Sequence, residues 1–164
     1  MKNKTIAVLL LIWLVAVAAL IFWFSSKNGE ESGDMSQNLT DEIFNFLARD
    51  EELGHKLHRF VRKSAHILEY ALLGASGCIF LFFIADAGFF RLRSRRLLAL
   101  CAWGGATLYA VTDEIHQIFV PGRGPSVTDV MIDALGALVG VAAVVYICRF
   151  ILKGKKICKE EGGI

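Results

Sequence analysis

Carboxylate, imidazole and guanidinium side chains gather in the stretch YAVTDEIHQIFVPGRGPSVTDVMIDALG, residues 109–136, between two apolar runs. These groups can donate, accept or transfer a proton, or bind an ion. Within a bilayer a charged side chain costs about 2.5–3.5 kcal/mol at the centre of a helix, so such residues normally face the protein interior and pair with one another. The stretch therefore predicts a polar site inside an apolar protein.

Three predicted helices and one turn supply the candidate site residues. At about 100° per residue, each helix gathers its polar residues on or beside one face. The candidates for acid–base chemistry are His66, Glu69, Asp113, Glu114 and His116. The candidates for ligand binding are Arg62, Lys63, Tyr70, Tyr109, Gln117, Arg123, Asp129 and Asp133.

Glu69, Asp113 and Asp133 are expected at one depth. Counted from the charged residues at the opposite ends of their helices, each lies roughly 25 Å along its helix at about 1.5 Å per residue. A hydrocarbon core is about 30 Å thick. Three helices should therefore deliver carboxylates to one layer just beneath the outer membrane surface.

The elements that carry these residues are predicted to be transmembrane helices. The chain has 164 residues, of which 55% are hydrophobic, and its mean hydropathy of +0.51 is too high for a soluble domain of this size. Apolar runs cover about residues 6–24, 65–85, 97–120 and 127–152, each long enough to cross a bilayer. We expect an all-α, polytopic membrane protein whose four spans form a single domain over residues 1–164.

The positive-inside rule predicts the orientation of these spans. Lysines precede the first span, RLRSRR separates the second from the third, and a basic tail, residues 153–164, follows the fourth. We therefore expect both termini on the cytoplasmic side of a bacterial plasma membrane, and residues 25–62 outside. The basic segments suit anionic lipids at the cytoplasmic face, and nothing in the sequence indicates a nucleic-acid partner.

The outer segment, residues 25–62, is predicted to contain a polar linker followed by short amphipathic helices. Apolar residues recur at helical spacing over residues 39–47 and 53–61, on either side of Gly54. Such helices would lie on the outer membrane surface or cover the bundle. None of the four cysteines falls in this segment, so no disulfide framework is predicted.

Local stability accounts for part of the polar pattern. Ser126 and Asp129 have the spacing of a capping box, which would satisfy the start of the fourth span. Asp133 lies beyond the first turn, and Asp113 and Glu114 lie near the end of a helix, where its dipole does not favour a negative charge. Gly136 and Gly140 form a small-xxx-small pair that permits close helix packing.

Three blocks of this sequence resemble the VanZ-like membrane proteins: FSSKNGEES, RKSAHILEYALLG and LYAVTDEIHQIFVPGRGPSVTDVMIDALGALVG, in that order. The resemblance implies a small bacterial membrane protein of a family whose namesake is associated with low-level resistance to teicoplanin, a lipid-tailed glycopeptide. By position, the resemblance marks eleven of the candidate residues above as family signature residues: Lys63, His66, Glu69, Tyr70, Asp113, Glu114, His116, Gln117, Arg123, Asp129 and Asp133.

Three functions remain open from the sequence. The site binds an amphiphile of the outer leaflet, such as a lipid-linked cell-wall precursor or a lipid-tailed glycopeptide, with basic residues meeting its phosphate or carboxylate. Alternatively, it is an intramembrane enzyme that modifies a lipid, either with a divalent metal held by histidines and carboxylates or by acid–base catalysis. In the third reading the charges form only a structural ion-pair network.

Overall fold

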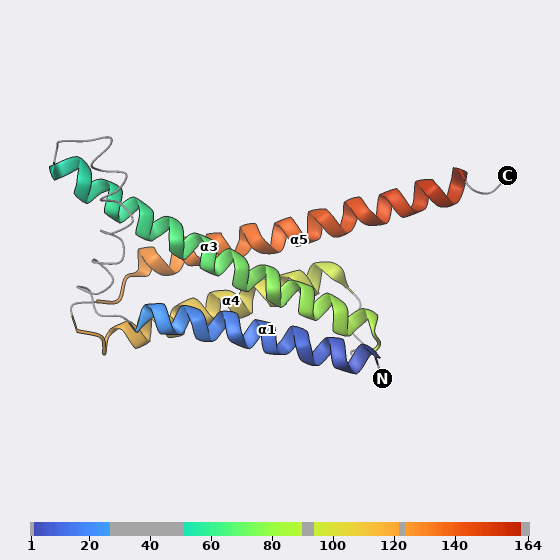
Figure 1. Ribbon diagram of the computed structural model, residues 1–164, viewed down its shortest axis with the longest axis horizontal. Helices are drawn as coiled ribbons and strands as arrows, with labels where there is room; N and C mark the ends of the chain where they lie inside the picture. The colour runs from blue at the N-terminus through green and yellow to red at the C-terminus, as the bar shows by residue number, and fades with distance from the viewer. Residues whose placement is uncertain (1, 27–50, 90–93, 122–123, 162–164) are drawn as a thin grey trace.

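The computed structural model describes residues 2–26, 51–89, 94–121 and 124–161, with side chains for 2–26, 60–61, 63–89, 94–121 and 124–151. Over these ranges all regular secondary structure is α-helical, as predicted, and short turns lie between the helices. The helices are α1 (Lys2–Ser25), α3 (Glu51–Asp86), α4 (Arg95–Gln117) and α5 (Val127–Glu161) (Figure 1).

Three of these helices have the length and apolar composition needed to cross a membrane: α1, the part of α3 from Lys63 to Asp86, and the part of α5 from Val127 to Ile151. α4 does not belong to this group because polar residues in its last two turns lower its hydropathy, so a fourth span remains a prediction. Its 23 residues correspond to about 34 Å of helix. The three helices that are long and apolar enough to cross a bilayer are typical of a membrane protein.

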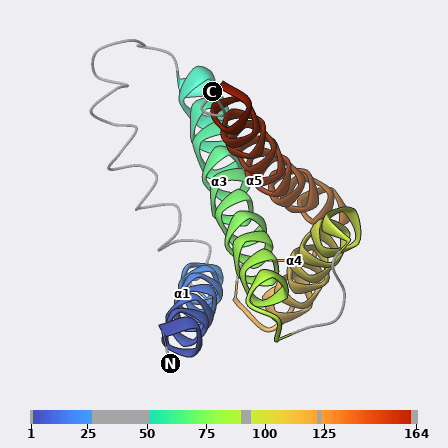
Figure 2. The ribbon, with the colours of Figure 1, turned by 90° about the vertical axis from the view of Figure 1, so that its right-hand side faces the viewer.

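α3 is the central helix of the bundle and packs against α1, α4 and α5 (Figure 2). α4 also contacts both α1 and α5. The start of α1, the end of α3 and the start of α4 lie toward one end of the bundle, and the last turns of α5 extend past it (Figure 1). The ends of α1 and α4 and the start of α5 lie at the opposite end.

The outward faces of the helices are apolar. Large hydrophobic side chains are exposed on every helix, including Trp13, Leu72, Leu108 and Phe150. A soluble domain rarely exposes so continuous an apolar surface. In a bilayer these side chains face hydrocarbon, so the pattern agrees with a membrane protein.

Glycines bring α3 and α5 into backbone contact, as the predicted small-residue pair required. A Cβ atom on Gly136 would lie 2.6 Å from the Ile67 carbonyl oxygen, and one on Gly140 would collide with the Ala71 carbonyl. On the facing helix, a Cβ on Gly74 would lie 2.5 Å from the carbonyl oxygen of Ala137. Only residues without a side chain permit this approach.

α3 is longer than the predicted span of residues 65–85, because it begins at Glu51. Residues 53–61 were expected to form a separate amphipathic helix, but the helix that begins at Glu51 continues through them directly into the span. The physical reason is that no proline interrupts residues 51–86, and the single Gly54 lowers helix stability without ending the helix. The other predicted amphipathic helix, residues 39–47, lies outside the described residues.

Hydrogen bonds join neighbouring helices within the apolar core. Trp13 Nε1 on α1 donates to Ser76 Oγ on α3 at 3.0 Å, and Tyr109 OH on α4 donates to the Ala18 carbonyl on α1 at 2.7 Å. Trp103 Nε1 donates to the Ala134 carbonyl at 3.0 Å and so joins α4 to α5. Such bonds contribute about 0.6 kcal/mol each in membrane proteins, and here they fix the rotation of α4 that directs Asp113 and Glu114 inward.

α4 begins and ends at recognisable signals. Ser94 is its N-cap, and the Ser94 side chain accepts a bond from the Leu97 amide. After Gln117 the chain tightens, with the amides of residues 118–120 bonded to carbonyls three residues earlier, and Pro121 then prevents further helix. The helix thus ends three residues before the predicted boundary at 120, at the level of the polar residues.

Candidate functional site

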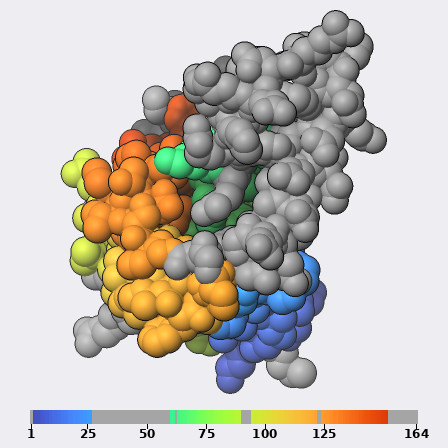
Figure 3. Space-filling view, turned by 90° about the vertical axis from the view of Figure 1, so that its left-hand side faces the viewer, coloured from blue at the N-terminus to red at the C-terminus, as the bar shows by residue number. Residues whose placement is uncertain are grey.

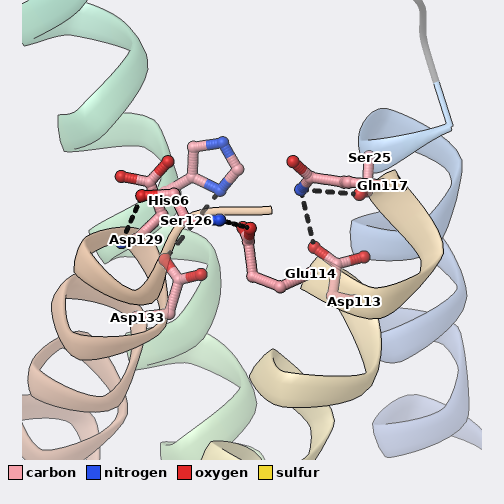
Figure 4. Close-up of polar contacts among 8 residues, drawn as sticks. All are labelled: Ser25, His66, Asp113, Glu114, Gln117, Ser126, Asp129 and Asp133. Atoms are coloured by element: carbon pink, nitrogen blue, oxygen red, sulfur yellow. Dashed lines mark hydrogen bonds and ion pairs between the residues drawn. The ribbon is translucent and has the colours of Figure 1, made fainter. Parts of the chain in front are cut away.

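Polar side chains from α1, α3, α4 and α5 converge at the end of the bundle formed by the last turns of α4 and the first turns of α5. Figure 3 views the molecule from this end, where α4 lies between α1 and α5. Figure 4 shows the side chains and the bonds between them. Asp133 lies within electrostatic range of Glu69, Asp113, Glu114 and Asp129. We call these five residues the carboxylate cluster.

Three members of the carboxylate cluster are buried. The exposed fractions of Asp113, Glu114 and Asp133 are 3%, 5% and 1%. Asp129 and Glu69 are partly exposed. The predicted convergence of carboxylates from three helices is therefore present in the structure, and it is densest between α4 and α5.

Gln117 connects the cluster to the end of α1. Its side-chain amide donates to Ser25 Oγ at 3.1 Å and to Asp113 Oδ2 at 3.4 Å (Figure 4). One residue earlier, His116 Nε2 lies 3.2 Å from Ser26 Oγ. The two serines therefore hold the last turn of α1 against the last turn of α4. Neither serine was among the predicted site residues.

The signal for these serines was visible in the sequence. The first apolar run ends in the polar pair Ser25–Ser26, within the block FSSKNGEES that carries part of the family resemblance. Ser25 is 2% exposed, and a buried hydroxyl in an apolar helix needs a partner. The sequence alone does not say which distant polar residue supplies it.

Glu114 is placed at the N-terminus of α5. Its Oε2 accepts a hydrogen bond from the Ser126 amide at 2.7 Å, while Ser126 Oγ accepts one from the Asp129 amide at 3.3 Å. The predicted capping interaction of Ser126 is confirmed. Glu114 lies near the C-terminus of α4, where the dipole of its own helix does not stabilise a carboxylate. The contact with Ser126 places this carboxylate at the N-terminus of α5, whose partial positive charge stabilises it.

The hydrogen bond from the Ser126 amide to Glu114 leads to a testable prediction for the turn between α4 and α5. Glu114→Ala should remove the acceptor of the Ser126 amide and speed its hydrogen exchange by about tenfold or more, since one charge-assisted hydrogen bond contributes about 1.5–3 kcal/mol. Exchange mass spectrometry of the peptide covering residues 124–130 measures this. Thr112→Val, which removes an exposed hydroxyl bonded to the Tyr109 carbonyl, is the control. Equal exchange in both variants would contradict the assignment.

Asp133 faces His66 across the contact between α5 and α3. Asp133 Oδ1 lies 3.9 Å from His66 Nδ1 (Figure 4), a distance suited to an ion pair but too long for a direct hydrogen bond. Within the described part of the chain neither oxygen of Asp133 has a hydrogen-bond partner, and the same holds for Asp113 Oδ1 and the Tyr70 hydroxyl. Each of these atoms belongs to a residue no more than 3% exposed.

Buried oxygens without hydrogen bonds are energetically costly. A buried polar group that loses its partner costs about 1–3 kcal/mol, and an ionised one costs more. Tyr70 lies within electrostatic range of both Asp113 and Asp133, so the acceptor oxygens border a common region between α3, α4 and α5. A ligand with several hydrogen-bond donors or a positive charge would satisfy them.

Other predicted site residues lie at the margin of the carboxylate cluster or outside it. Glu69 lines a small apolar cavity of about 130 Å³ with Trp13 and Leu72 between α1 and α3. Lys63 is exposed, and the Tyr109 hydroxyl is engaged by the Ala18 carbonyl. The Arg62 side chain and all of Arg123 lie outside the described residues, so their predicted role at the site stays a prediction.

The predicted metal-binding role has a limited geometric basis. Among the residues that the structure describes, no three His, Cys, Asp or Glu side chains are grouped so that they could hold one ion. His66 and His116 lie on different helices and contact Asp133 and Ser26 respectively. The carboxylate cluster thus presents buried hydrogen-bond acceptors, and its described residues do not form a preassembled set of metal ligands.

Comparison with known proteins identifies the family. The model of the VanZ/LLP1 family matches residues 10–151, a range that covers all the predicted site residues. Neither the curated proteins nor the solved structures gave a significant match. Because the matched range includes most of the chain, this protein belongs to the VanZ/LLP1 family.

Proposed function

We propose that this VanZ/LLP1 protein binds the head group of an amphiphile from the outer leaflet at the carboxylate cluster. The class of ligand is a lipid-linked cell-wall precursor or a lipid-tailed glycopeptide such as teicoplanin, and binding would link the protein to glycopeptide resistance. One observation carries the proposal: Asp113, Asp133 and Tyr70 bury oxygen atoms that no described residue hydrogen-bonds. Sugar hydroxyls and amines of such a head group are donors that suit these oxygens.

The surface next to the cluster offers space for an apolar tail. A groove of about 340 Å³ between α1, α3 and α4 is lined by Leu14, Leu73, Gly77, Ala106 and Tyr109. Tyr109 is one helical turn from Asp113, so the groove begins near the cluster and runs away from it along the helices. A head group in the cluster would therefore leave its tail beside the bundle, in contact with lipid.

Charge also supports a head group with donors or cations. The cluster contains five carboxylates, and among the described residues the imidazole of His66 lies 3.9 Å from Asp133. A ligand cation would lower the repulsion among them. Lys63 is exposed at the same end of α3, and we expect it, with Arg62 and Arg123, to contact a phosphate or carboxylate of the ligand.

Native mass spectrometry tests the proposal. Wild type and Asp113→Asn would be released from detergent and examined for a retained lipid, then titrated with teicoplanin and with its deacylated core. We expect wild type to prefer the acylated glycopeptide or to retain an envelope lipid, and Asp113→Asn to bind about tenfold less of it, as expected for one charged hydrogen bond.

The matched control is Asp86→Asn, the same substitution at an exposed aspartate near the far end of α3. It should bind as wild type does. If wild type retained no amphiphile and bound neither glycopeptide form, the proposal would be wrong. If Asp113→Asn kept full binding, the cluster would not be the head-group site.

An acid–base enzyme is the second candidate, favoured by the contact between His66 and Asp133. A carboxylate that faces an imidazole can orient it for proton transfer. This reading predicts that the retained lipid is chemically changed during incubation with wild type, and unchanged with Asp133→Asn. Elemental analysis of the purified protein tests the metal-dependent form, since stoichiometric zinc or manganese would favour it.

A further inference from the structure

Another apolar cavity, open as a groove between the helices, lies at the other end of the bundle, far from the carboxylate cluster. It encloses about 370 Å³ between α3, α4 and α5, and its walls are mainly apolar. Ala99, Leu100 and Trp103 line it from α4, and Val141 and Val145 line it from α5. The last turns of α5 diverge from the other helices at this end (Figure 1), which leaves the space between α4 and α5 unfilled.

Three arginines surround this cavity. Arg95 and Arg96 come from the first turn of α4, and Arg149 comes from α5. Arg95 is held in place, because its guanidinium bonds both oxygens of Asp86 at 2.6–2.7 Å and lies 4.5 Å from the centre of the Phe82 ring. Within the described residues neither Arg96 nor Arg149 makes an ion pair or a hydrogen bond, and both are exposed.

We propose that this cavity binds one acyl chain of an anionic phospholipid, whose phosphate lies between Arg96 and Arg149. An apolar groove whose mouth carries two unpaired guanidinium groups is complementary to a lipid with a negative head group. Arginine binds phosphate through paired donors, and basic pockets between helices are suited to acidic lipids. The arginine-rich end is the one predicted to be cytoplasmic, so the lipid belongs to the inner leaflet.

The arrangement explains why the arginines come from two helices. A topological signal requires only positive charge near the ends of the spans, and either helix alone would supply it. A phosphate held by both Arg96 and Arg149 would add a second polar link between α4 and α5, beyond the hydrogen bond from Trp103 Nε1 to the Ala134 carbonyl. The lipid would complete the packing between the two helices.

Fluorescence quenching by brominated lipid tests this site, because Trp103 lines the groove. Trp13 and Trp23 would be replaced by phenylalanine so that Trp103 reports alone, and the protein placed in phosphatidylcholine bilayers with a small fraction of phosphatidylglycerol brominated on its chains. We expect brominated phosphatidylglycerol to quench Trp103 more strongly than its fraction in the bilayer would give without a binding site. Each arginine should contribute about fivefold to that preference, given roughly 1 kcal/mol per basic residue near a surface.

The variants separate a specific site from general attraction. Arg96→Gln/Arg149→Gln should lose the preference for phosphatidylglycerol. Lys2→Gln/Lys4→Gln removes the same charge from the same end of the bundle, on exposed residues that do not line the groove, and should keep it. Equal quenching by brominated phosphatidylglycerol and brominated phosphatidylcholine in the parent protein, or equal loss in both double variants, would overturn the proposal.

A second measurement avoids the tryptophan substitutions. Native mass spectrometry of the protein with its own tryptophans, in an equimolar mixture of the two lipids, should show retained phosphatidylglycerol that the Arg96→Gln/Arg149→Gln variant lacks. Ala99→Phe, which fills the groove while keeping the arginines, should lose the same lipid. Retention of phosphatidylglycerol by Ala99→Phe at the wild-type level would exclude the groove as the binding site.

Discussion

Gly140→Ala should destabilise this protein more than the same substitution at any other glycine that the structure describes. The new Cβ would collide with the Ala71 carbonyl on α3. Its neighbours there are backbone atoms, which cannot move aside as a flexible side chain can. Overpacking costs about 1–3 kcal/mol, and we expect the upper part of that range because α3 and α5 must separate along their shared seam.

Gly104→Ala is the matched control for this substitution. Gly104 lies within α4, and a Cβ atom there has no neighbour within 4 Å. Alanine also has the higher helix propensity, by about 1 kcal/mol in water. The two glycine-to-alanine changes should therefore have opposite signs: loss of stability at position 140, and no change or a gain at position 104.

Thermal unfolding in detergent, followed by intrinsic fluorescence, measures both variants. A lower midpoint for Gly140→Ala with an unchanged or higher midpoint for Gly104→Ala supports the close packing of α3 and α5. Equal midpoints would mean that the backbones are not in contact at Gly140. The result matters for the site, because the same seam sets the separation of His66 and Asp133.

The positions of the helices could be predicted from the sequence because hydrophobicity is a property of each segment by itself. The apolar run predicts α1, and the spacing of Gly136 and Gly140 predicts close helix packing, without any information on the neighbouring helices. The continuity of α3 through Gly54 was missed for the opposite reason: a glycine weakens a helix by a modest free energy, and packing of the rest of the helix decides whether it continues.

The site was predictable in its residue types but not in its pairings. Helical periodicity placed Asp113 and Asp133 on inward faces, where the structure has them buried. It did not predict that Glu114 accepts from the Ser126 amide, or that Gln117 reaches Ser25, because these contacts depend on the separation and rotation of helices distant in sequence. The apolar cavity beside Arg149 was likewise invisible, since it exists only where α5 diverges from α4.

Asp133→Asn should greatly weaken ligand binding without lowering the stability of the protein. Asp133 is 1% exposed and neither of its oxygens has a hydrogen-bond partner among the described residues. A buried carboxylate in this state is costly, so its neutral counterpart should leave the unfolding midpoint unchanged or raise it. Loss of one or two charged hydrogen bonds, at about 1.5–3 kcal/mol each, should weaken binding by roughly tenfold to more than a hundredfold.

The combination of the two results separates a binding site from a structural ion-pair network. If the contact between Asp133 and His66 served only to hold α3 and α5 together, its removal would leave a buried charge uncompensated and cost about 3–5 kcal/mol. The unfolding midpoint and the affinity for teicoplanin would be measured on the same preparations, with Asp86→Asn as the control for affinity. A large fall in the midpoint would identify Asp133 as a structural residue. A stable protein that no longer binds would show that Asp133 is kept, despite its cost, for the ligand.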